Sequence, residues 1–144
     1  MRGYVLDTMV LSELNKPKAD RHVIRWVEET EETLLYVSVL TLGEIRQGIS
    51  AHASGARRDK LQRWLEATLR PWFAGRILAV DDDVADRWGD INGTLRARGI
   101  IIPVIDGLLA ATALHHNLTF ATRNIDHVAP TGVATYNPWD RGGS

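Results

Sequence analysis

Short hydrophobic runs alternate with helically spaced hydrophobic positions along this chain. Runs rich in β-branched and aromatic residues at 4–6, 34–39, 77–80, 118–122 and 133–136 predict strands. Between them, hydrophobic residues recur every three or four positions, as at Leu42, Ile45 and Ile49, which predicts amphipathic helices. The predicted order of elements is β-α-α-β-α-α-β-α-α-β-β.

Helices that separate successive strands imply crossover connections, and crossovers join parallel strands. We therefore expect an α/β fold, a three-layer α/β/α sandwich with a mostly parallel sheet. Pro17, Pro71 and Gly99 are predicted to end helices, and Pro103 is predicted to open one. The length and the absence of a linker or repeat predict that residues 1–144 form one domain.

Composition narrows the choice of function classes. Hydrophobic residues make up 44% of the chain, enough for a continuous core, and no Cys is available for disulfides or thiolate metal sites. The formal net charge of −1 means that any nucleic acid must be held by a local basic patch. The N-terminal hydrophobic run is interrupted by Asp7 and is too short for a signal core or a membrane span, so we expect a soluble, cytoplasmic protein.

Three carboxylates from distant parts of the chain are candidates for a common site. Asp7 follows the first predicted strand, and ligands of open parallel sheets bind at the carboxyl ends of the strands. Glu44 lies beside a hydrophobic helical stripe, and Asp106 lies in the first turn of the helix after Pro103. Helix capping is the alternative for Asp7 and Asp106, and plain surface exposure is the alternative for Glu44.

Asn124 and Asp126 follow the predicted strand 118–122 and would add oxygen ligands at the same edge, although turn formation explains them equally well. Carboxylates that converge without a cation would repel one another. Mg²⁺ or Mn²⁺ would relieve that repulsion and keep bound waters, which is the chemistry of phosphodiester hydrolysis.

Four stretches of the chain resemble the motifs of PIN-domain proteins, and in particular VapC-type toxin ribonucleases of type II toxin-antitoxin pairs. YVLDTMVLSEL resembles the opening motif, VSVLTLGEIRQGI the second, and PVIDGLLAATALHHNLTFATRN the third and fourth. YNPW resembles the closing segment of a FitB-like subgroup. Together these stretches span nearly the whole chain.

The resemblance implies a Mg²⁺-dependent ribonuclease with Asp7, Glu44 and Asp106 as metal ligands. It places Thr122 and Asn124 near the fourth acidic position, and we include Asn124 among the catalytic candidates. It further implies a five-stranded parallel sheet, a homodimer, and inhibition by a VapB-like antitoxin that binds DNA.

Two departures from the family pattern motivate an alternative function. Met9 stands where the opening motif commonly has Asn, and Met cannot donate the same hydrogen bonds. Asn124 is neutral where many members carry Asp, so one ligand charge is lost unless Asp126 turns inward. The alternative is a catalytically weak PIN-like module that binds RNA or a partner without turnover.

Other charged residues have simpler interpretations. Residues 81–83 could suggest a phosphoacceptor pocket, but we assign them to helix capping. Arg46 and Arg123 could steer phosphates or form ion pairs. The histidines at 115, 116 and 127 receive no role, and the five Trp are expected in the core or an interface. A basic stretch could steer phosphates or form a solvated helix face; its members are Arg57, Arg58, Lys60 and Arg63.

Overall fold

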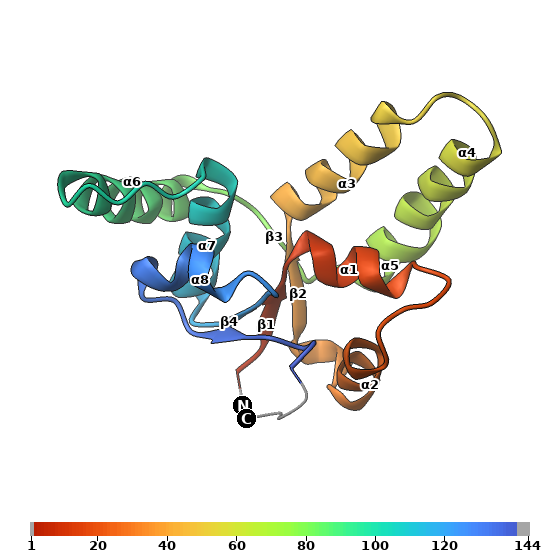
Figure 1. The fold of residues 1–144 in the computed structure, drawn as a ribbon, viewed down its shortest axis with the longest axis horizontal. Helices are drawn as coiled ribbons and strands as arrows, with labels where there is room; N and C mark the ends of the chain where they lie inside the picture. The colour runs from red at the N-terminus through yellow and green to blue at the C-terminus, as the bar shows by residue number, and fades with distance from the viewer. Residues whose placement is uncertain (1, 141–144) are drawn as a thin grey trace.

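Five parallel strands form the central sheet of the computed structural model, which describes residues 2–140 (Figure 1). The strands lie in the order β3-β2-β1-β4-β5, so the first strand of the chain is central. Their bounds are Tyr4–Leu6 for β1, Leu35–Ser38 for β2, Ile77–Leu78 for β3, Thr119–Ala121 for β4 and Thr135–Tyr136 for β5. All four pairings are parallel, as the crossover argument predicts.

Helices cover both faces of this sheet, which confirms the predicted three-layer α/β/α sandwich (Figure 1). One face carries α1 (Thr8–Leu14), α2 (Arg21–Glu29), α3 (Val39–Ala51), α4 (Ala56–Arg63) and α5 (Arg70–Trp72). The other carries α6 (Asp82–Ala97), α7 (Val104–His116) and α8 (Ile125–Val128). Within residues 2–140, no helix has the length and apolarity needed to cross a bilayer.

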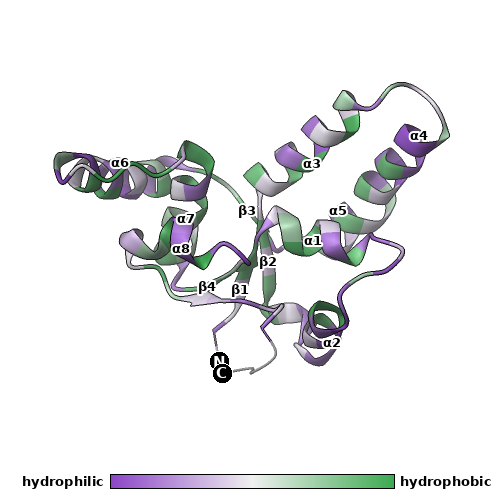
Figure 2. Ribbon diagram, viewed as in Figure 1, coloured by the Kyte–Doolittle hydropathy of each residue, from purple (hydrophilic) through white to green (hydrophobic). Residues whose placement is uncertain are grey.

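Alternation along the strands divides the core into two clusters, one on each face of the sheet. Successive side chains of a strand point to opposite faces. Val5 accordingly packs with Phe120 under α7, while Leu6 packs with Leu35 on the α1 and α3 side. The strands are largely hydrophobic, whereas α4 is largely hydrophilic and only one side of it meets the core (Figure 2).

Helix ends follow the predicted signals with one exception. Gly99, at φ 77°, follows the end of α6, and Pro103 directly precedes α7. The helix predicted to stop before Pro71 instead continues through a π-helical segment, Trp64–Leu69, into α5. In this segment the backbone hydrogen bonds change from the i→i+4 to the i→i+5 pattern. The change lies next to Pro71, which has no N–H to donate, so the helix continues through the proline.

The connection between β4 and β5 also differs from the prediction. The sequence pattern places the two strands in direct succession, but α8 and a 3₁₀ turn, Ala129–Thr131, lie between them. A parallel pair needs a crossover because the chain must return to the starting edge. The four-residue α8 is too short to display a helical period in the sequence.

Replacing Leu35 by Ala is expected to lower the free energy of unfolding by about 2–5 kcal/mol, because Leu35 is 1% exposed and its loss leaves a cavity beneath α3. Urea titration followed by circular dichroism measures the change. Ile101→Ala is the control: Ile101 is 81% exposed, so its truncation should change stability by less than about 0.5 kcal/mol. Equal effects of the two substitutions would contradict the assigned core.

Candidate metal centre

Asp7 lies at the carboxyl end of the central strand, between β1 and α1. Its backbone N–H donates to the carbonyl oxygen of Ala121 at 2.9 Å, which continues the β1–β4 pairing by one residue. Its Oδ2 accepts a hydrogen bond of 2.7 Å from Oγ1 of Thr122, a side chain that is 1% exposed. Although Asp7 occupies the N-cap position of α1, its carboxylate makes no capping hydrogen bond. Its carboxylate is therefore held at the carboxyl end of the sheet by Thr122 and does not act as a cap of α1.

Glu44 reaches the same edge from α3. This helix starts directly after β2, where the side chain of Ser38 accepts a hydrogen bond from the N–H of Leu40 at 3.0 Å. Oε1 of Glu44 accepts a 2.5 Å hydrogen bond from Oγ1 of Thr8, the first residue of α1. Glu44 is half-buried, so the simple surface interpretation does not describe it.

Asp106 approaches from the first turn of α7 and is also half-buried. The N-cap residue of α7, Pro103, makes no side-chain capping hydrogen bond, and Asp106 is the acidic residue of the first turn. The free N–H groups at a helix amino end favour a negative charge there. Its Oδ2 lies 4.0 Å from Nδ1 of His127, which stands on α8.

The three carboxylates are close enough to affect one another electrostatically. Burial raises the pKa of Asp7 above its ordinary value, and the negative charges of Asp106 and Glu44 raise it further. Hydrogen bonds from the Thr122 hydroxyl and the Thr8 backbone act in the opposite direction. The structure thus brings Asp7, Glu44 and Asp106 together, as the sequence predicts, and their mutual repulsion is only partly offset.

The donor set at this edge fits a hard divalent cation. Three carboxylates offer hard oxygen ligands of the kind that Mg²⁺ and Mn²⁺ prefer. A cation bound among the three carboxylates would attract them. It would thus counteract the repulsion by Asp106 and Glu44, which adds to the effect of burial on the pKa of Asp7. We call Asp7, Glu44 and Asp106 the acidic trio.

The predicted fourth position is linked to the acidic trio through the backbone. The N–H of Asn124 donates to Oγ1 of Thr122 at 3.1 Å, and that hydroxyl in turn donates to Asp7. The side chain of Asn124 is exposed and does not cap α8. Asp126 is exposed in the first turn of α8, and no hydrogen bond or ion pair within the described chain joins it to the trio. Catalysis by Asn124 stays a prediction.

Sequence reasoning missed two neighbours of the acidic trio, Thr8 and His127. The sequence pattern assigns no role to Thr8, whose hydrogen bond to Glu44 spans 36 positions. His127 lies in the short helix that the pattern did not predict. In the sequence, the one feature that points to these two residues is that each stands next to a candidate ligand. Thr8 follows Asp7, and His127 follows Asp126.

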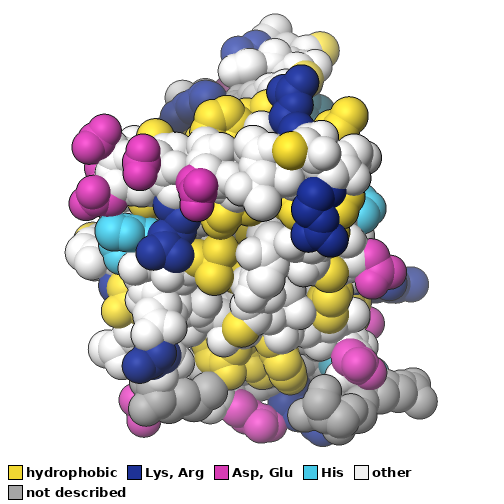
Figure 3. Space-filling view, turned by 90° about the vertical axis from the view of Figure 1, so that its left-hand side faces the viewer, with side chains coloured by type: hydrophobic (Ala, Val, Ile, Leu, Met, Phe, Trp, Pro, Cys, Tyr) yellow, Lys and Arg dark blue, Asp and Glu magenta, His cyan; other side chains and the backbone are white. Residues whose placement is uncertain are grey.

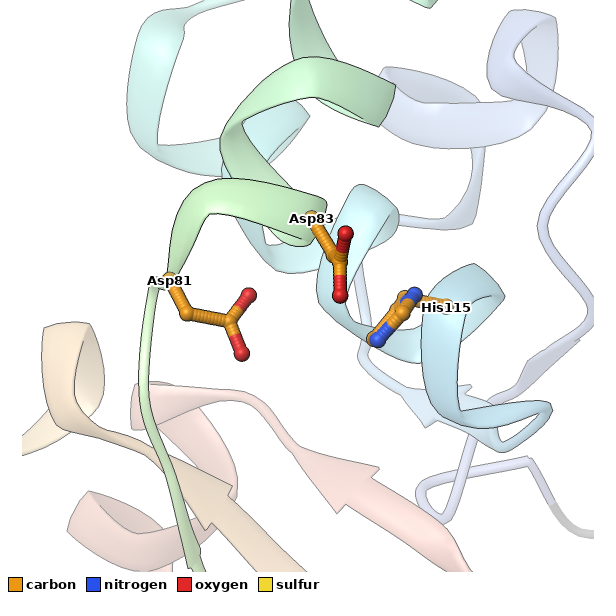
Figure 4. Close-up of side chains that lie close together, drawn as sticks. All are labelled: Asp81, Asp83 and His115. Atoms are coloured by element: carbon orange, nitrogen blue, oxygen red, sulfur yellow. The ribbon is translucent and has the colours of Figure 1, made fainter.

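A second group of ligand-type side chains lies elsewhere, at the start of α6 and the end of α7. Oxygen or nitrogen atoms of Asp81, Asp83 and His115 lie within 4.8 Å of one another, and the side chains turn toward a common space (Figure 4). Both carboxylates are exposed, and on the face viewed in Figure 3 acidic side chains gather beside histidine at one edge. Asp81 Oδ1 also accepts from the N–H of Val84 at 3.0 Å, which confirms the predicted cap.

This second group is separate from the acidic trio. His115 follows Asp106 by nine residues on α7, which is roughly 13 Å along the helix axis. The sequence analysis did not connect His115 with residues 81–83. Its position arises because α6 and α7 pack against each other along their lengths.

The two arginines considered for phosphate steering have protein partners. Arg46 forms an ion pair with Glu66, and not with the acidic trio. The guanidinium of Arg123 lies 5.2 Å from the ring centroid of Trp139. Trp139 packs against the hydrophobic core, as do Trp26, Trp64 and Trp72, in agreement with the expected core role.

Comparisons with known proteins cover nearly the whole chain. A family model described as PIN domain matches residues 4–131. VapC ribonuclease Y4jK of Sinorhizobium fredii is 38% identical over 136 residues, which are 94% of this chain and 97% of that protein. Toxin FitB of Neisseria gonorrhoeae is 36% identical over 135 residues, again 94% and 97%. A solved structure of FitAB bound to a DNA fragment superposes with a TM-score of 0.89 at 34% identity, covering 95% of this chain and 96% of that one.

Asp7→Asn is expected to raise the melting temperature of the protein in EDTA at pH 7 by about 3 °C, which corresponds to ~1 kcal/mol in a domain of this size. A folded-state pKa above the ordinary 3.8 means that ionising Asp7 costs stability as the pH rises through that folded-state pKa. Asn keeps an acceptor for Thr122 but carries no charge. The difference in melting temperature between Asp7→Asn and the wild type should therefore become smaller as the pH falls toward 4.

Differential scanning fluorimetry at pH 4 to 7 measures this difference. Asp90→Asn serves as the control, because Asp90 is exposed on α6 and away from the trio. An Asp7→Asn variant that is less stable than wild type at pH 7 would show that burial and the neighbouring carboxylates do not make ionised Asp7 unfavourable.

Proposed function

The chain belongs to the PIN-domain family, and from that premise we propose that it is a metal-dependent ribonuclease, the toxin of a type II toxin-antitoxin pair. The observation that carries the proposal is the acidic trio: three carboxylates from α3, α7 and the β1–α1 junction meet at the carboxyl end of the sheet, where burial and the charges of Asp106 and Glu44 raise the pKa of Asp7. We further propose that residues 1–144 act as one nuclease domain in the cytoplasm. Relatives named as a VapC ribonuclease and as a toxin support this assignment.

Asp7, Glu44 and Asp106 are the residues proposed to hold the cation, Mg²⁺ or Mn²⁺. When bound, such a cation polarises a phosphodiester and lowers the pKa of a coordinated water. The chain's own contribution is orientation. The Thr122 hydroxyl fixes Oδ2 of Asp7, and the Thr8 hydroxyl fixes Oε1 of Glu44.

A partner protein is part of this proposal. The FitAB assembly, solved on a DNA fragment, contains the FitB toxin that this chain resembles. By the same logic, a VapB-like antitoxin would bind this chain, and a cationic side chain laid against the acidic trio would satisfy the same carboxylates. We also propose a homodimer, as the family resemblance implies.

Two observations support a second candidate, a PIN-like module that binds RNA or a partner without turnover. Asn124 supplies no charge at the fourth acidic position, and the half-buried Met9 stands in the opening motif. This candidate shares the fold and the binding surface with the ribonuclease. It differs only in the expected absence of cleavage.

Purified protein is expected to cleave a mixed RNA pool with Mg²⁺ and to lose that cleavage in EDTA. Asp7→Asn, Glu44→Gln and Asp106→Asn should each lower the rate by about 100-fold or more, since loss of a supporting partner alone costs 10–100-fold at metal sites. Gel analysis of end-labelled RNA measures the rate. Asp83→Asn is the control, because it removes an exposed carboxylate of the second group and leaves the trio intact.

The possible results separate the alternatives. Cleavage that is unchanged in EDTA and in the trio variants would exclude the metal mechanism. Binding of RNA without cleavage under all conditions would favour the weak module. Loss of cleavage in Asp83→Asn, with activity kept in Asp106→Asn, would move the site to Asp81, Asp83 and His115.

Asn124→Asp is expected to lower the Mg²⁺ concentration for half-maximal cleavage by about threefold or more, because it adds a carboxylate next to the Thr122–Asp7 hydrogen bond. Titration of Mg²⁺ in the same cleavage assay measures the shift. Asp126→Asn provides the comparison for the neighbouring carboxylate. A raised Mg²⁺ requirement in Asn124→Asp would show that Asn124 is not directed toward the cation.

A further inference from the structure

A groove of about 360 Å³ leads away from the acidic trio between α1, α3 and α4. It begins at Thr8 and Glu44, which also belong to the candidate metal centre. From there it follows α3 past Gly48 to His52, the C-cap residue of this helix. Glu44 and His52 are eight residues apart, roughly 12 Å along the axis of α3. We call this feature the α3–α4 groove.

The two ends of the α3–α4 groove have opposite charge. The end at Glu44 is acidic, whereas the far end is lined by Arg57 and Lys60 of α4 and by Lys16 after α1. Lys16 forms an ion pair with Glu13 at 3.0 Å. Arg57 and Lys60 are exposed and have no ion-pair partner within residues 2–140. Two unneutralised cations therefore line the groove away from the metal centre.

The middle of the α3–α4 groove is apolar and open. Its lining there includes Ile45, Ile49, Leu61 and Trp64, which all belong to or pack against the core. Gly48 leaves the α3 wall bare, and a Cβ built on it meets no atom within 4 Å. Glycine inside a helix is less stabilising than alanine. Gly48 thus keeps this wall of the groove open although alanine would stabilise α3 more.

We infer that the α3–α4 groove holds the single-stranded RNA beside the scissile phosphate, with Arg57 and Lys60 binding phosphates a few nucleotides away. This inference rests on the proposed function. At about 3.4 Å per nucleotide of a stacked strand, the 12 Å between Glu44 and His52 corresponds to roughly three nucleotides. The apolar middle then faces the bases, which pack on apolar and aromatic side chains in single-strand sites.

Charge complementarity favours RNA over an acidic peptide in this groove. An acidic peptide would pair with Arg57 and Lys60 but would be repelled by Glu44 and the rest of the trio. An RNA strand satisfies both ends, because the scissile phosphate meets the acidic trio through the cation and the distant phosphates meet the basic side chains. A uniformly acidic peptide lacks this arrangement and would leave the end at Glu44 unsatisfied.

The test measures binding of a fluorescein-labelled 12-nucleotide single-stranded RNA to the full chain carrying Asp7→Asn, with Mg²⁺ present. Adding Arg57→Gln and Lys60→Gln together is expected to weaken binding about 10-fold. The binding constant falls as salt rises, and each phosphate contact contributes about 0.7 to the steepness of log K against log salt for a single strand. Removing two contacts should therefore make this dependence shallower by about 1.4. Arg58→Gln with Arg63→Gln is the matched control, because both lie on α4 outside the groove lining and remove the same charge.

A second pair of variants tests the groove without changing charge. Gly48→Gln fills the open α3 wall and is expected to weaken RNA binding at least fivefold. Gly93→Gln is its control, because Gly93 is an exposed glycine of α6 with no atom within 4 Å of a built Cβ. Thermal melts of all variants verify that each is folded, and neither glycine replacement should lower the melting temperature.

Equal weakening by the two α4 double variants, or by the two glycine variants, would overturn the inference. A second result would also overturn it: the variant that lacks Arg57 and Lys60 binds RNA as tightly as before but no longer binds a labelled octaglutamate peptide. That result would assign the groove to an acidic partner. Cleavage by the chain with Asp7 intact is scored separately. Groove-specific RNA binding without cleavage would reject the proposed function alone, and cleavage without groove-specific binding would reject the groove alone.

Discussion

The parallel pairing of β1 with β4 is the constraint on which the candidate metal centre depends. Leu6 lies opposite Ala121, so the next residues, Asp7 and Thr122, leave the sheet at the same edge. The Asp7 N–H bonds to Ala121, and the buried Thr122 hydroxyl fixes the carboxylate. A one-residue slip in register would send every strand side chain to the opposite face, which the two hydrophobic clusters forbid. The core thus determines the position of the first carboxylate.

The acidic trio stores unfavourable electrostatic energy within this frame. Burial and two neighbouring carboxylates raise the pKa of Asp7, and the hydrogen bond from Thr122 offsets part of that effect. The fold supports the charges from rigid elements: Asp7 at a strand end, Glu44 on α3 and Asp106 on α7. The backbone positions of the three carboxylates are thereby fixed relative to one another. A cation bound among the three carboxylates, as proposed, would relieve this repulsion, and the repulsion would then favour metal binding.

Hydrophobic periodicity was sufficient to predict the layers, the parallel sheet and most helices, because every long element has one buried face. It could not predict α8, whose four residues are fewer than two helical turns, nor the π-helical passage through Pro71. For the acidic trio, the positions along the chain indicated that the three carboxylates could meet at one end of the sheet. The resemblance to the family motifs then identified Asp7, Glu44 and Asp106 as its members. Contacts such as Thr8 with Glu44 depend on how α1 and α3 pack, and no local pattern records that distance.

Local charge arrangement, and not net charge, distinguishes this chain as a candidate nuclease. A formal charge of −1 gives no general attraction to RNA. The structure nevertheless separates the signs: carboxylates lie at the carboxyl end of the sheet, whereas Arg57 and Lys60, which have no ion-pair partner among residues 2–140, line the groove that starts there. Neutralising the trio with a divalent cation would leave the basic end of the groove uncompensated. Metal and RNA would then bind cooperatively, because each relieves a charge imbalance that the other leaves in place.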